Sequence, residues 1–143
     1  MTIQATRRFR TASAEDIPSL AAIRLAVREN LLRSTITQEM YRDALTTHGQ
    51  GWVCEVGEKL VGFAIAMRDG SIWALFVLPS FESQGIGREL LSRAMGWLQA
   101  EGPRRVWLCT APGTRAASLY RSLGWRPTGE MPNGDVRYEF CAD

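Results

Sequence analysis

Residues 75–91 read Leu-Phe-Val-Leu-Pro-Ser-Phe-Glu-Ser-Gln-Gly-Ile-Gly-Arg-Glu-Leu-Leu, and this stretch decides the fold. Its first four residues, 75–78, are the end of a nearly continuous apolar run over 72–78, and such a run is typical of a central strand covered on both faces. Pro79 ends the strand, because proline has no N–H to donate to a sheet. From Gly85 onward, apolar residues recur at helical spacing. The stretch therefore predicts a buried strand, a short loop and an amphipathic helix.

The loop of this unit has the chemistry of a phosphate-binding site. The first N–H groups of a helix have no intrahelical acceptor, and the helix dipole favours an anion beside them. Gly85 and Gly87 would let a ligand approach the backbone closely, so the amides of residues 84–88 are candidates for the cradle. A simpler alternative stays open, in which the two glycines only permit tight packing of the helix on the strand.

The rest of the chain supplies further strands and helices around this unit. We expect a strand near 9–12, a helix capped at Ser13 with Asp16 at its third position, and a break over 30–36. Further expected elements, in chain order, are a helix over 38–45, a hairpin of 52–56 and 59–66 around Gly57-Glu58, the helix from Gly85 to Gly102-Pro103, a strand over 106–110, a helix over 114–123 and a final hairpin turning at Asn133-Gly134 into 136–140. We interpret residues 1–143 as a single domain.

The composition narrows the class of protein. The 143 residues are 45% hydrophobic and 22% charged, as in an ordinary globular domain, and the net charge of +2 is too small to indicate nucleic-acid binding. Three scattered cysteines without CxxC spacing suggest neither disulfides nor a metal site. No signal sequence or apolar run of membrane-spanning length is evident, so we expect a cytoplasmic protein with no membrane contact.

Two sequence blocks carry a family resemblance. Leu75 to Pro79 followed by Gln84 to Leu91 resembles the acetyl-CoA-binding motif of the GNAT N-acetyltransferases. Ala116 to Trp125 is similar to the family's tyrosine segment, in which Ala, Tyr, Gly and an aromatic residue recur at the same spacing. The resemblance implies an α/β (α+β) fold with a central mixed, mostly antiparallel sheet and helices on both faces.

The resemblance also implies a function. It implies an acetyl-CoA-dependent N-acetyltransferase, without a metal, whose acceptor is a primary amine of a small molecule or a peptide. The residues it assigns to acetyl-CoA are Leu75, Phe76, Val77, Glu82, Ser83, Gln84, Gly85, Ile86, Gly87, Arg88, Glu89, Gly113, Ala116 and Tyr120.

The implied mechanism uses one backbone group and one side chain. The central strand would splay from its neighbour at 106–110 to admit the pantetheine arm, and an N–H near Phe76 or Val77 would hold the acetyl oxygen. The amine would attack the thioester directly, and Tyr120 would protonate the CoA thiolate. The alternative for Tyr120 is that it only packs between helix and sheet.

Two positions depart from the family pattern. Glu82 stands where Gln or Arg is usual, and Gly113 where many members have Asn. Because a carboxylate repels a pyrophosphate, we expect the Glu82 side chain to point away, toward Arg88 or Arg121. Both departures leave open a weaker affinity for CoA.

The sequence offers only candidates for the general base and for the residues that contact the acceptor amine. Relatives place a carboxylate near positions 73 and 74, where this chain has Trp and Ala, so Glu55, Glu139 and His48 are base candidates only by elimination. Residues 28–50 and 130–135 would contact the acceptor, with Glu130 and Asp135 able to attract a cationic amine. A catalytically inactive CoA-binding regulatory module is the alternative function, and a homodimer through the final hairpin is possible.

Overall fold

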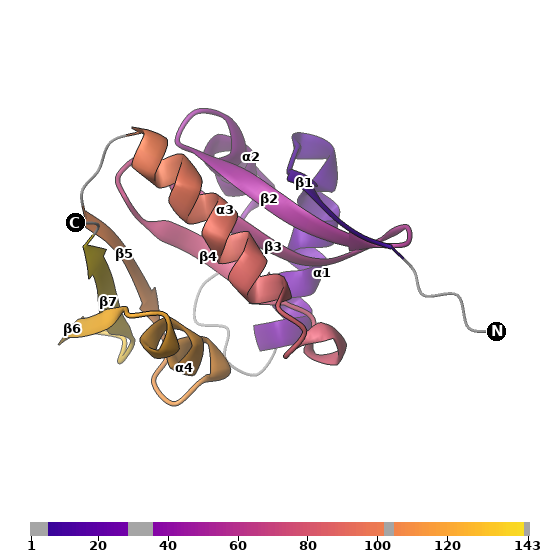
Figure 1. The fold of residues 1–143 in the computed structure, drawn as a ribbon. Helices are drawn as coiled ribbons and strands as arrows, with labels where there is room; N and C mark the ends of the chain where they lie inside the picture. Colours follow the sequence, from indigo (N-terminus) through magenta and orange to yellow (C-terminus); the bar gives the residue numbers. More distant parts are fainter. Residues whose placement is uncertain (1–5, 29–35, 102–104, 142–143) are drawn as a thin grey trace.

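Figure 1 shows the computed structural model of the chain, which describes residues 6–28, 36–101 and 105–141. The elements are β1 (Arg7–Thr11), the 3-10 turn η1 (Ala14–Asp16), α1 (Ile17–Arg28), α2 (Gln38–Thr46), β2 (Gly49–Val56), β3 (Lys59–Met67), β4 (Ile72–Val77), the 3-10 turn η2 (Pro79–Phe81), α3 (Ile86–Glu101), β5 (Arg105–Thr110), α4 (Arg115–Ser122), β6 (Arg126–Glu130) and β7 (Val136–Cys141). This order is the predicted one. No helix in the described ranges is long and apolar enough to cross a membrane.

Helices cover both faces of the first sheet, as the predicted fold class requires. Strands β1 to β4 pair in sequence order, each antiparallel to the next. Because successive side chains of a strand point to opposite faces, Phe63 and Ile65 pack with α1 and α2, while Ala64 and Ala66 pack with α3. Two hydrophobic cores therefore lie on opposite sides of one sheet.

The second sheet is separate from the first, in line with the splay of the central strand from 106–110 that the family resemblance implied. It has the order β5-β7-β6, and among the described residues one parallel bridge, between Ser71 just before β4 and Trp107 of β5, links the two sheets. Beside that bridge, the register of β4 against β3 shifts, so that Trp73 is an extra residue. A bulge bends its strand, so β4 turns away from β5 beyond the bridge. The two strands are joined at one end and open at the other.

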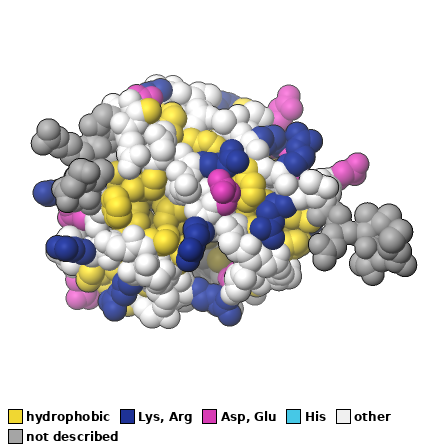
Figure 2. Space-filling model, in the orientation of Figure 1, with side chains coloured by type: hydrophobic (Ala, Val, Ile, Leu, Met, Phe, Trp, Pro, Cys, Tyr) yellow, Lys and Arg dark blue, Asp and Glu magenta, His cyan; other side chains and the backbone are white. Residues whose placement is uncertain are grey.

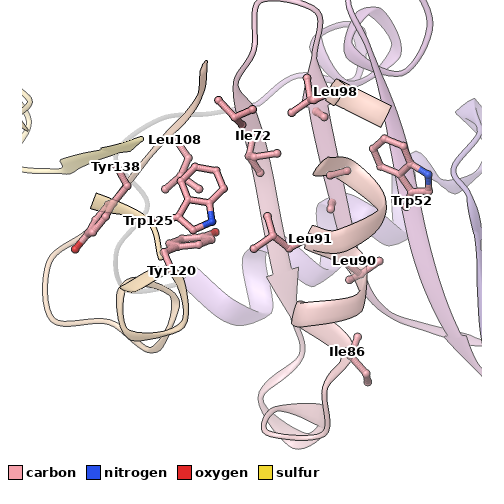
Figure 3. Packing of buried hydrophobic residues seen from close by; sticks show 14 of the residues in the cluster. Trp52, Ile72, Ile86, Leu90, Leu91, Leu98, Leu108, Tyr120, Trp125 and Tyr138 are labelled. Carbon is pink, nitrogen blue, oxygen red and sulfur yellow. The ribbon is translucent and has the colours of Figure 1, made fainter. Parts of the chain in front are cut away.

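One apolar cluster holds α3 and α4 to the two sheets. Figure 3 shows Leu90, Leu91 and Leu98 of α3 directed at the first sheet, with Tyr120 and Trp125 on the far side of β4. Leu90 and Leu98 are fully buried. Truncation of such a leucine to alanine costs about 2–5 kcal/mol, so the packing of α3 is a main source of stability.

A charged cluster ties β1 to the 3-10 turn η1 before α1 and to β2. The guanidinium of Arg10 donates two hydrogen bonds of 2.9 Å to the carboxylate of Asp16 and a third to Glu55. Asp16 also accepts from the backbone N–H of Ser13 at 2.8 Å, which confirms the predicted acidic residue at this helix start. The bonds from Arg10 hold the pKa of Asp16 below its usual value.

Candidate functional site

A cleft of about 1220 Å³ opens where β4 and β5 diverge. It is bounded by β4, the loop before α3, the end of β5 and α4. The predicted residues that line it are Leu75, Phe76, Val77, Glu82, Ser83, Gln84, Gly85, Gly87, Arg88, Gly113, Ala116 and Tyr120. Ile86 instead places its side chain in the core, and Glu89 pairs with Arg93 along α3 at 2.9 Å. Segments 75–88 and 113–120 thus meet around one cavity.

The backbone of β4 presents hydrogen-bonding groups to this cleft. The N–H of Leu78 donates to Val61 of β3 at 2.8 Å. In an antiparallel ladder the residues alternate, so Phe76 also faces β3, whereas Leu75 and Val77 direct their N–H and C=O away from it. The sequence left Phe76 and Val77 as alternatives for the acyl-oxygen donor, and the register favours Val77.

The facing edge of β5 has the same property. The N–H of Trp107 donates to Gly70 at 3.0 Å, so Trp107 and, two residues on, Cys109 turn their backbone groups toward β4. The two parallel edges therefore form a slot with backbone donors and acceptors on both sides. Such a slot suits an extended amide-containing chain that pairs with it like an added strand.

The helix start beside the slot is shaped for close approach by a ligand. Helix α3 begins at Ile86, and the N–H of Glu89 donates to Gly85 at 3.0 Å, which leaves the preceding amides without an intrahelical acceptor. Gly85 has φ +85°, which favours glycine. A Cβ on Gly85 would meet nothing within 4 Å, and one on Gly87 only ordinary contacts at 3.7 Å. Tight packing therefore does not require either glycine.

Glu82 lines the cleft near the start of α3, and its partner differs from the predicted ones. Its Oε2 lies 3.3 Å from NH1 of Arg115, the first residue of α4, and not beside Arg88 or Arg121. The same nitrogen donates to Oγ of Ser83 at 2.9 Å. The prediction of Arg88 or Arg121 was wrong, because it considered neither the α4 start nor its approach across the cleft.

The other departure has a backbone explanation. Gly113 has φ +74°, and a Cβ there would meet nothing within 4 Å. Asn is one of the few residues with a side chain that adopts this left-handed conformation readily. Gly113 therefore adopts a backbone conformation that Asn could also adopt. Glycine at this position is compatible with the same turn into α4.

Tyr120 lies at the inner wall of the cleft. Its ring is 4% exposed and packs against Trp125 and Tyr138, with centroids 5.6 and 6.2 Å apart (Figure 3). None of the hydrogen bonds in the described part of the chain involves its hydroxyl, and burial raises its pKa. The phenol thus stays protonated over the physiological range, with its donor available to a ligand.

The base candidates proposed by elimination do not line the cleft. Glu55 pairs with Arg10, and Glu139 lies 3.3 Å from Arg105. His48 is exposed just after α2. Within the described ranges, no group of three or more His, Cys, Asp or Glu residues could hold a metal ion. The cleft wall therefore combines backbone groups, Tyr120 and a single paired carboxylate, Glu82.

The residues in and near the cleft include two that sequence reasoning missed, Cys109 and Tyr41. Cys109 lines it, and burial raises the pKa of that thiol. Trp73 lines it beside Tyr41, whose buried hydroxyl has no hydrogen-bond partner among the described residues. Of the predicted acceptor segments, residues 29–35 lie outside the described residues. The buried Oδ1 of Asp135 likewise has no partner there. No local sequence signal marks Cys109 or Tyr41, because only the fold brings them to this region.

Comparison with known sequences establishes the family. The family described as Acetyltransferase (GNAT) matches residues 17–125, which include both motifs. The peptidyl-lysine N-acetyltransferase YiaC of Escherichia coli is 27% identical over 87% of this chain and 91% of its own length. An uncharacterized ycf52-like N-acetyltransferase of Prochlorococcus marinus is 35% identical over 47% of this chain and 38% of its own length. The chain belongs to the GNAT acetyltransferase family, as its two motifs predicted.

Comparison with solved structures agrees on the fold. An N-acetyltransferase of Staphylococcus aureus superposes with a TM-score of 0.81 at 19% identity, covering 96% of this chain and 99% of that one. A PaiA N-acetyltransferase of Thermoplasma acidophilum, in complex with coenzyme A, gives a TM-score of 0.79 at 16% identity over the same shares of the chains. At these identities the likeness establishes the shared fold.

Proposed function

We propose that this protein is an acetyl-CoA-dependent N-acetyltransferase that acts on a primary amine. The observation that carries the proposal is the slot between β4 and β5, whose lining includes both the start of α3 and Tyr120. The backbone groups of β4 and β5 fit the pantetheine amides of acetyl-CoA, and the unpaired amides at the start of α3 fit its phosphates. The hydroxyl of Tyr120 fits its sulfur. The family match supports the same reaction.

In this proposal the cofactor is held mainly by backbone groups. The amides at the start of α3 bind the diphosphate, with the helix dipole adding to their attraction. The outward groups of Leu75 and the C=O of Val77 would pair with the pantetheine amides. When bound, acetyl-CoA supplies an activated acyl group for attack by the amine. A structural neighbour in complex with coenzyme A supports this assignment.

Val77 and Tyr120 act at the reacting atoms. The N–H of Val77 donates to the acyl oxygen as negative charge develops there, and loss of one such donor typically costs about 10²–10³ in rate. The hydroxyl of Tyr120 donates to the departing sulfur. A thiol has a pKa near 8.5 and an ordinary phenol near 10, so the phenol is protonated when the thiolate forms. Burial of Tyr120 strengthens that preference.

The acceptor amine enters as a neutral group. A lysine-like amine has a pKa near 10.4, and Glu82, the one carboxylate along the described cleft wall, is paired with Arg115. We therefore propose that water carries the proton away. The relatives include a peptidyl-lysine N-acetyltransferase and a ribosomal-protein-alanine N-acetyltransferase, which favours a peptide amine over a small metabolite.

The test is acetyl-CoA binding by calorimetry, with release of CoA thiol measured on a panel of lysine peptides, N-terminal peptides and polyamines. We expect binding, and turnover with at least one amine class. Binding without turnover on any amine would favour the CoA-binding regulatory module. The non-ionisable residues Trp73 and Ala74, at positions where relatives have a carboxylate, are the sequence feature that supports this alternative. Absence of binding would refute both.

A further inference from the structure

We infer that Arg115 binds a phosphate group of CoA and that Glu82 and Ser83 hold it over the cleft for that purpose. This inference rests on the proposed function. It assigns a binding role to a residue outside both sequence motifs, and it gives Glu82 a part in CoA binding.

The geometry places Arg115 at the rim of the phosphate end. Helices α3 and α4 begin on opposite sides of the cleft, and Figure 2 shows a hollow between them with basic side chains on its rim. From the α4 side, NH1 of Arg115 reaches Ser83 at 2.9 Å and Glu82 at 3.3 Å, both in the loop that leads into α3. The contact joins segments 32 residues apart in the sequence.

The guanidinium of Arg115 has N–H donors that no described residue accepts. Only NH1 of Arg115 has a hydrogen bond or ion pair within the described residues. An arginine carries five N–H donors in a planar fork, which matches two oxygens of a phosphate. The side chain of Arg115 is 73% exposed, so its other donors are open to solvent and to a ligand.

The ion pair of Glu82 with Arg115 changes the net charge that a bound phosphate meets. Glu82 is the acidic residue along the described cleft wall, and its carboxylate lies in the loop beside the amides that receive the diphosphate. A bare carboxylate there would repel the ligand, whereas one paired with Arg115 is neutralised. The pair is neutral as a whole, so it removes the repulsion and leaves the other N–H donors of Arg115 for the ligand.

The test is a set of calorimetric titrations with CoA. We expect Arg115→Ala to weaken binding roughly tenfold, as for loss of one partly exposed charge-assisted hydrogen bond. In a Glu82→Gln background the same change should cost about threefold less, because the carboxylate that Arg115 masks is gone. Arg126→Ala, an exposed arginine of β6 outside the cleft, controls for the change in net charge. Thermal unfolding checks that each variant is folded.

Dephospho-CoA identifies the phosphate. An equal loss with CoA and dephospho-CoA assigns Arg115 to the diphosphate, and a loss seen only with CoA assigns it to the 3′-phosphate. If wild-type protein binds CoA and folded Arg115→Ala binds it equally well, the inference fails while the proposed function stands. If wild-type protein does not bind CoA, both fail.

Discussion

Gly87→Ala should separate stability from cofactor binding. A methyl group at this position would lie 3.7 Å from Leu119 and Val77, an ordinary van der Waals distance, so the protein should fold. Replacement of a helical glycine by alanine stabilises by up to about 1 kcal/mol. Gly87 also lines the cleft at the α3 start, where a ligand phosphate would need the space of that methyl group.

The expected loss of affinity follows from the hydrogen bonds between the phosphate and the backbone amides at the start of α3. If the phosphate is displaced from one amide, the lost charge-assisted hydrogen bond costs about 1.5–3 kcal/mol. This corresponds to a Kd for acetyl-CoA roughly ten- to hundredfold higher. The assays are calorimetric titration for Kd and urea denaturation for the free energy of unfolding.

Gly96→Ala is the matched control. Gly96 lies in the same helix, a Cβ there would meet nothing within 4 Å, and it does not line the cleft. It should gain similar stability and bind acetyl-CoA like the wild type. A Gly87→Ala protein that is folded and binds acetyl-CoA as tightly as Gly96→Ala would refute the phosphate cradle.

Three further changes test other parts of the account. Tyr120→Phe removes a hydroxyl without a hydrogen-bond partner in the described structure, so the melting temperature and CoA affinity should hold while kcat falls about 10²–10⁴-fold; an unchanged kcat would leave Tyr120 a packing residue. Asp16 has a lowered folded-state pKa, so its stabilising effect is full above its unfolded pKa and lost as the pH falls through the folded value; Asp16→Asn should lower stability at neutral pH and flatten the acid limb of an unfolding curve, and an unaltered acid limb would contradict this. Leu90→Ala should cost about 2–5 kcal/mol in urea denaturation, and a cost below 1 would mean that α3 does not depend on this contact.

The element order followed from local patterns in the sequence. The apolar run over 72–78, the proline after it and the helical spacing from Gly85 each report on neighbouring residues, and local rules govern them. The structure has β4 over Ile72–Val77 and α3 from Ile86. The same holds for the Gly57-Glu58 turn, since β2 ends at Val56 and β3 begins at Lys59.

Long-range geometry was beyond these rules. The family resemblance implied that the central strand splays from 106–110, but the bulge at Trp73 is visible only in the register of β4 against β3. The partner of Glu82 was missed for a similar reason, because Arg115 comes close only when α4 packs across the cleft. The choice of Val77 over Phe76 as the outward donor likewise needed the ladder of β4 with β3. Motifs located the site, and tertiary structure was needed to orient its groups.

The most direct measurement is a titration of the wild-type protein with acetyl-CoA, with release of CoA thiol followed in the same sample after addition of a lysine or N-terminal peptide. The account predicts saturable binding at one site per chain and thiol release that depends on the peptide. Absence of saturable binding would contradict the assignment of the slot between β4 and β5 as an acetyl-CoA site.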